Sequence, residues 1–149
     1  MDDQQPINQD SLPSAPSTRS DPSRCPRQTI LLVDDEKVIL EVTTRLLGSL
    51  GFDVLPARQG EDALRLFSEH RQSICLALVD LTMPKMSGEE IVRELCRLTA
   101  DLPVVMMSGY PESDVLTSLP GVRLAGYLQK PFRLPVVLEL LKRLNLIEE

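Results

Sequence analysis

The sequence predicts a doubly wound α/β fold, a parallel sheet with helices on both faces. Short, continuous apolar runs alternate along the chain with longer segments whose apolar residues recur at helical spacing. There are five of each, and strands separated by helices form parallel sheets joined by right-handed crossovers. The 149 residues are enough for one such domain with a full hydrophobic core.

The expected strands are residues 29–33, 52–57, 75–80, 103–107 and 123–129. The first, third and fourth are continuous apolar runs, which are typical of strands buried on both faces. The second contains Pro56, which has no amide proton for a central ladder, so we expect it near an edge of the sheet.

Helices are expected between and after these strands. In the first helix Ile39, Val42, Leu46 and Leu50 share one apolar face, and Gly51 ends it. The other helices are expected at about 60–70, 87–98, 112–119 and 133–145. The third of the five begins with a Ser-x-x-Glu capping box at residues 87–90, and the last has Pro135 in its first turn.

Residues 1–27 differ in composition from the rest. They hold five of the twelve prolines and almost no apolar residues, so they cannot bury enough surface to offset their ordering entropy. We expect a disordered leader at 1–27, a folded domain at 28–146 and a short C-terminal end at 147–149. Because Glu149 follows the last expected helix closely, we expect no DNA-binding or catalytic output domain.

The overall composition excludes several classes of function. A net charge of −6, scarce aromatic residues and no Trp disfavour nucleic acid and anionic membranes as partners. No apolar run is long enough to span a bilayer, and no secretory signal is visible, which indicates a cytoplasmic protein. The three cysteines form no Cys-x-x-Cys pair, and two of them, Cys75 and Cys96, are expected to be buried and inert.

Chemically active side chains directly follow four of the expected strands. They are Asp34 and Asp35 after the first, Asp80 at the end of the third, Ser108 after the fourth and Lys130 after the fifth. Because the carboxyl ends of parallel strands meet at one edge of a sheet, we expect these side chains to converge there.

Such a cluster suits phosphoryl transfer. Crowded carboxylates raise one another's pKa, and a hard cation such as Mg²⁺ relieves the repulsion. A carboxylate can also act as a nucleophile and become an aspartyl phosphate. Lys130 and Ser108 would then stabilise charge on the transferring group.

The ordered set of motifs is that of a known family. It consists of D-D at 34–35, D-L-T-M-P-K-M-S-G at 80–88, S-G at 108–109 and Y-L-Q-K-P-F at 127–132. Over about residues 29–145 the chain resembles the receiver domains of bacterial response regulators, and also the receivers of hybrid histidine kinases. The resemblance implies a flavodoxin-like sheet of strand order 2-1-3-4-5 and a signalling phosphoacceptor of a two-component phosphorelay that is not an enzyme acting on other substrates.

The resemblance also implies roles for single residues. Asp80 would accept the phosphoryl group, Lys130 would pair with its oxygens, and Ser108 would close on them. Mg²⁺ would be bound by the side chains of Asp35 and Asp80, by the backbone carbonyl of Thr82, and by Asp34 through a water. Tyr127 would be the switch aromatic, and the Lys130–Pro131 peptide bond would be cis.

Partners follow from the same resemblance. The phosphodonor would be a phosphohistidine on a histidine kinase or a histidine phosphotransfer protein, since His70, the only histidine, is expected to be solvated at a helix end. Output would run through a downstream protein at the face formed by the fourth helix, the fifth strand and the fifth helix.

Three alternatives remain at this point. They are alternatives to a stand-alone receiver domain. The first is the receiver portion of a hybrid histidine kinase, the second is a haloacid-dehalogenase-like phosphatase, and the third is a flavodoxin-like nucleotide or flavin binder. Such phosphatases place a second Asp two residues after the nucleophile, where this chain has Thr82. A nucleotide binder would need a Gly-rich phosphate loop after the first strand, and none is present.

Overall fold

The computed structural model describes residues 28–83, 85–117 and 119–148. Its centre is a parallel sheet of five strands in the order β2-β1-β3-β4-β5, as the family resemblance implied. The strands are β1 (Thr29–Val33), β2 (Asp53–Ala57), β3 (Ile74–Asp80), β4 (Val104–Ser108) and β5 (Gly126–Gln129). The leader expected at 1–27 lies outside the described residues.

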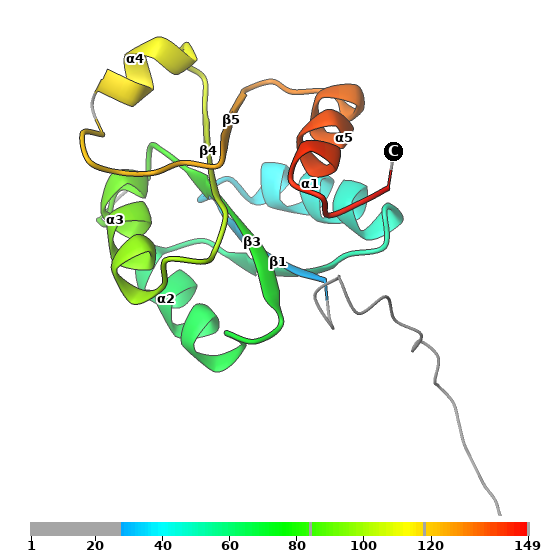
Figure 1. Ribbon diagram of the computed structural model, residues 1–149, viewed down its shortest axis with the longest axis horizontal. Helices are drawn as coiled ribbons and strands as arrows, with labels where there is room; N and C mark the ends of the chain where they lie inside the picture. Colours follow the sequence, from blue (N-terminus) through cyan, green and yellow to red (C-terminus); the bar gives the residue numbers. More distant parts are fainter. Residues whose placement is uncertain (1–27, 84, 118, 149) are drawn as a thin grey trace, which may run out of the picture.

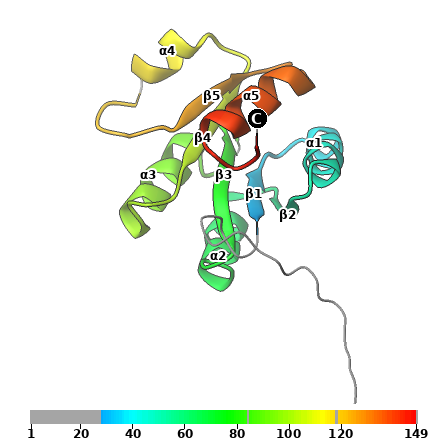
Figure 2. The ribbon, with the colours of Figure 1, turned by 45° about the vertical axis from the view of Figure 1, so that its right-hand side comes forward.

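Within the described residues, five helices pack on the two faces of this sheet. They are α1 (Lys37–Ser49), α2 (Gly60–Glu69), α3 (Gly88–Leu98), α4 (Glu112–Thr117) and α5 (Leu134–Arg143). Figures 1 and 2 show α1 and α5 together on one face, with α2, α3 and α4 on the other. The fold is the doubly wound, flavodoxin-like sandwich predicted from the sequence.

The strands divide the core into two layers because successive side chains point to opposite faces of a sheet. Leu31 and Val33 of β1 lie in the layer under α2, α3 and α4, whereas Ile30 and Leu32 lie in the layer under α1 and α5. All four side chains are fully buried, which explains why β1 is continuously apolar. The strand that carries Pro56, β2, is at one edge of the sheet, as predicted.

The structure corrects the predicted buried face of α1. The residues facing the core are Leu40, Thr43 and Leu47, while Val42 is 60% exposed. Apolar residues surround most of this helix, so their spacing fits two different faces. Contact with β1 and β2 decides between the faces, and it buries a threonine where the pattern indicated a valine.

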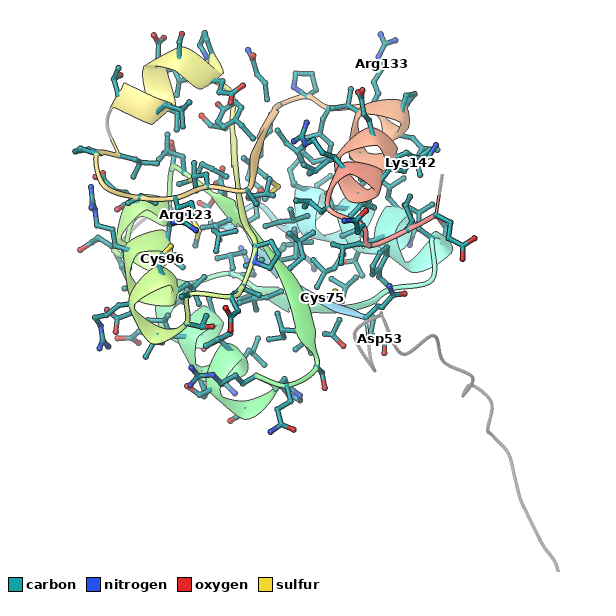
Figure 3. All side chains as sticks on the ribbon, viewed as in Figure 1. Asp53, Cys75, Cys96, Arg123, Arg133 and Lys142 are labelled. Atoms are coloured by element: carbon teal, nitrogen blue, oxygen red, sulfur yellow. The ribbon has the colours of Figure 1, made fainter. Side chains whose placement is uncertain are left out.

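The remaining local predictions concern helix starts and the thiols. The capping box is present, with Ser87 Oγ accepting from the Glu90 amide and Glu90 Oε1 accepting from the Ser87 amide. Cys75 is buried in β3, whereas Cys96 on α3 is partly exposed and lies beside Arg123 (Figure 3). Burial raises the pKa of the Cys96 thiol, so it is a poor nucleophile. Among the described residues no helix is long and apolar enough to cross a membrane.

Candidate functional site

The strand order brings the predicted site residues together at the carboxyl edge of the sheet. This edge is called the rim below, and its residues are Asp34, Asp35, Asp80, Ser108 and Lys130. Because β3 lies between β1 and β4, Asp80 at the end of β3 is flanked by Asp34 and Asp35 on one side and by Ser108 on the other. The backbone ladder continues past the strand ends, where the Lys130 amide donates to the Ser108 carbonyl at 2.7 Å. The rim therefore unites residues that lie up to 96 positions apart in the chain.

The carboxylates of this rim are close enough to share an ion. Asp34, Asp35 and Asp80 each offer an oxygen, and these atoms lie within 4.8 Å of one another. Asp34 and Asp80 are buried, and Asp35 is partly exposed. Carboxylate oxygens are the ligands that Mg²⁺ prefers, so these three residues could hold that ion.

Lys130 is the cation of the cluster. Its Nζ donates to Asp34 Oδ2 at 2.7 Å and to Asp80 Oδ1 at 3.1 Å, and it lies 3.6 Å from Glu36 Oε1. The other oxygen of Asp34 accepts the Glu36 amide at 3.0 Å, so Asp34 is held on both sides. The Lys130–Pro131 bond is cis, as the family resemblance implied.

Ser108 and Tyr127 are both linked to the backbone of Tyr110. The buried Ser108 Oγ accepts the Tyr110 amide at 3.0 Å, and the Tyr127 hydroxyl donates to the Tyr110 carbonyl. The Tyr127 ring is partly buried and packs against the core layer under α2, α3 and α4. One peptide segment thus connects the hydroxyl of the rim to the aromatic ring of β5.

The loop between β3 and α3 closes tightly under the rim. The Gly88 amide donates to the Leu81 carbonyl at 2.9 Å, and a Cβ added to Gly88 would lie 2.0 Å from the Asp80 carbonyl oxygen. Only glycine lets α3 begin this close to the end of β3. Thr82 is exposed in this loop and Met83 is buried beneath it.

Burial and charge shift the titration of the cluster. Burial, followed by the negative charge of Asp34, raises the pKa of Asp80 to about 6, although Lys130 counteracts this. Burial lowers the pKa of Lys130, but its hydrogen bonds to Asp34 and Asp80 outweigh burial and raise the pKa above the usual value. Without a metal, the ionised form of Asp80 is therefore disfavoured in the folded state.

This shift predicts how the stability of the metal-free protein depends on pH. The folded state binds the Asp80 proton more tightly than the unfolded state, so its contribution to stability is full below the unfolded pKa of 3.8 and is lost as the pH rises through about 6. Asp80→Asn removes the charge. At about pH 8 we expect it to raise the free energy of unfolding by about 1–2 kcal/mol. This is less than the full energy of a shift of roughly two pKa units, because water at the open rim screens part of the charge.

Urea unfolding at about pH 4 and pH 8 without divalent metal measures this difference. The advantage of Asp80→Asn should shrink to a small fraction at the lower pH, where the folded parent is also neutral at this position. A mutant that is less stable than the parent at both values would contradict the account of a crowded, buried carboxylate.

Two rim residues were missed by sequence reasoning. Glu36 lies beside Lys130, and its place next to Asp34 and Asp35 was the available signal. Arg58, after β2, donates from Nη2 to the Asp35 carbonyl at 3.2 Å, and nothing in the sequence pattern pointed to it. His70 is exposed at the end of α2, as expected.

Comparison with known proteins agrees with this fold. The model of the response regulator receiver domain family matches residues 30–142. The chain is 35% identical over 106 residues to a sensor kinase, CckA, of Brucella abortus, covering 71% of this chain and 11% of that protein. The chain spans less than half the length of the curated relatives first matched.

Two solved structures show the likeness in three dimensions. A receiver domain protein of Clostridium thermocellum superposes with a TM-score of 0.71 at 32% identity, covering 78% of this chain and 93% of that one. The response regulator TrrA of Thermotoga maritima, solved with Mg²⁺ and BeF, gives a TM-score of 0.68 at 28% identity, covering 78% and 98%.

These matches do not favour the phosphatase or the flavin-binding alternative. They agree instead with a receiver domain built on a parallel sheet of five strands. The chain belongs to the response regulator receiver domain family of two-component systems.

Proposed function

We propose that Asp80 accepts a phosphoryl group from a phosphohistidine of a histidine kinase or a histidine phosphotransfer protein in the cytoplasm. The observation that carries this proposal is the position of Asp80 between two further carboxylates and the Lys130 ammonium. An oxygen of Asp80 forms the new bond to phosphorus while the bond from phosphorus to the imidazole nitrogen breaks, and its electron pair leaves on the imidazole.

The rim is suited to Mg²⁺, with Asp35, Asp80 and the Thr82 carbonyl as direct ligands and Asp34 acting through a water. Both oxygens of Asp34 already accept hydrogen bonds, which supports an indirect role. When bound, the ion neutralises the carboxylates and the charge on the phosphoryl oxygens. The complex of the related TrrA with Mg²⁺ and BeF supports a Mg²⁺ site at this rim.

Lys130 and Ser108 supply the remaining contacts to the phosphoryl group. Lys130 is placed to exchange its bond to Asp80 for one to a phosphoryl oxygen, which removes a buried ion pair but keeps the charge compensated. Ser108 would rotate its hydroxyl from the Tyr110 amide toward the phosphoryl group. The domain then catalyses only its own phosphorylation and dephosphorylation.

Intact mass measurement after incubation with acetyl phosphate and Mg²⁺ tests this function. We expect one phosphoryl adduct, and none when the metal is chelated. Absence of any adduct while the fold is intact would overturn the proposal.

Output is proposed to run through protein contact at the face of α4, β5 and α5. A rotation of Ser108 would leave the Tyr110 amide without its partner, and the same peptide segment holds the Tyr127 hydroxyl. Movement there would reach the α4 surface, where Leu116 is 45% exposed. Phosphate would thus bias two states by its different contacts in each.

Amide spectra with and without beryllofluoride and Mg²⁺ measure this switch residue by residue. We expect shifts at Tyr110, Tyr127 and α4 as well as at the rim. Shifts confined to the residues around Asp80 would contradict a switch that passes through Tyr127.

A further inference from the structure

We infer that Arg58 favours acyl phosphates among the phosphodonors of this domain, by binding the carboxylate that leaves. The inference rests on the proposed function of Asp80. It concerns a part of the reaction that Lys130 and the acidic rim do not serve, namely the charge that develops on the leaving group.

Arg58 is an exposed cation at the edge of the site. It follows β2, and its Nη2 is anchored on the carbonyl of Asp35, one of the rim residues, at 3.2 Å. Within the described part of the chain its guanidinium forms no ion pair with a carboxylate, whereas Lys130 is surrounded by Asp34, Asp80 and Glu36. Arg58 is therefore available to an incoming anion.

A pocket beside Arg58 provides room for that anion. It has a volume of about 500 Å³ and shares Asp35 with the rim, with Gln59, Asp62 and Arg65 among its other walls. Arg65 is already bridged to Asp62 and Glu69, so its charge is compensated. Among the described residues that line this pocket, the guanidinium without a carboxylate partner is that of Arg58.

The chemistry of the leaving group decides where such a cation matters. When an oxygen of Asp80 bonds to the phosphorus of an acyl phosphate, the bond from phosphorus to the acyl oxygen breaks and its electron pair leaves on a carboxylate. Negative charge on that oxygen grows toward the transition state, so a guanidinium beside it binds the transition state better than the ground state. A guanidinium also matches the two oxygens of a carboxylate in a bidentate fork.

Phosphoramidate and phosphohistidine have no such requirement. They react in the form that is protonated on the amino nitrogen or on the second ring nitrogen, so the phosphorus–nitrogen bond breaks to release neutral ammonia or neutral imidazole. A cation has no negative charge to stabilise on either leaving group. Arg58 should therefore separate acyl phosphates from nitrogen-linked donors, and so separate response to small metabolic acyl phosphates from response to a kinase.

Phosphorylation rates of the full chain with acetyl phosphate and with phosphoramidate, both with Mg²⁺, test this. We expect Arg58→Ala to slow the reaction with acetyl phosphate about tenfold, less than the loss of a buried oxyanion donor because Arg58 is exposed, and to change the reaction with phosphoramidate less than about twofold. Arg58→Lys should recover part of the loss. Arg45→Ala, which removes the same charge from the neighbouring α1 surface, is the matched control and should change both rates less than about twofold.

The outcomes separate this inference from the proposed function. If the parent forms no adduct with either donor, the function of Asp80 fails. If the parent reacts with both donors and Arg58→Ala slows both equally, with weaker beryllofluoride binding, Arg58 only supports Asp35 and the inference is wrong. Unchanged rates with both donors would also overturn it.

Discussion

Asp80→Asn is expected to abolish the phosphoryl adduct while leaving the fold intact. The amide is nearly the same size as the carboxylate but is not a nucleophile, so no new bond to phosphorus can form. The side chain is 7% exposed and already accepts from Lys130, a bond that the amide oxygen can keep. Intact mass after treatment with acetyl phosphate and Mg²⁺ should show the parent mass only.

The control is Asp35→Asn, which retains the nucleophile. Because Asp35 is proposed as a direct ligand of Mg²⁺, this variant should still form the adduct on Asp80 but should need more metal, by at least the roughly 10–100-fold that loss of an outer-shell partner costs. A full adduct in Asp80→Asn would move the nucleophile to another residue. Equal loss in both variants at every Mg²⁺ concentration would show that the assay reports metal binding only.

Gly88→Ala should be the most destabilising single methyl addition in the domain. The new Cβ would lie 2.0 Å from the Asp80 carbonyl oxygen and 2.7 Å from the Leu81 Cα, and neither is the end of a flexible side chain. The start of α3 would have to move away from β3, which breaks the bond from the Gly88 amide to Leu81. We expect a loss of about 3 kcal/mol, at the upper end of overpacking costs, or roughly 10 °C in Tm.

Gly48→Ala is the matched control because it adds the same methyl group inside a helix with nothing within 4 Å. Alanine loses less backbone freedom on folding than glycine does, so the free energy of unfolding of this variant should rise by about 0.5–1 kcal/mol. Thermal melts of both variants beside the parent give the comparison. Equal stability of the two alanine variants would contradict the close packing of α3 on the end of β3.

Much of the architecture can be predicted from the sequence because it depends on local periodicity. The continuous apolar runs of β1, β3 and β4 mark strands buried on both faces, and Pro56 marks an edge strand. The sequence also determined that Asp34, Asp35 and Asp80 follow strands that share one edge, so their convergence follows from parallel topology alone. The strand order itself came from the family resemblance.

Only the tertiary structure decided which groups touch. Local spacing could not choose between two faces of α1, and docking on the sheet buried Thr43 and exposed Val42. Glu36 and Arg58 reach the rim because the β1–α1 and β2–α2 loops meet there, a neighbourhood set by pairing of β1 with β2. Local periodicity determines elements because it depends on neighbours three or four residues apart, whereas these contacts depend on how separate elements pack.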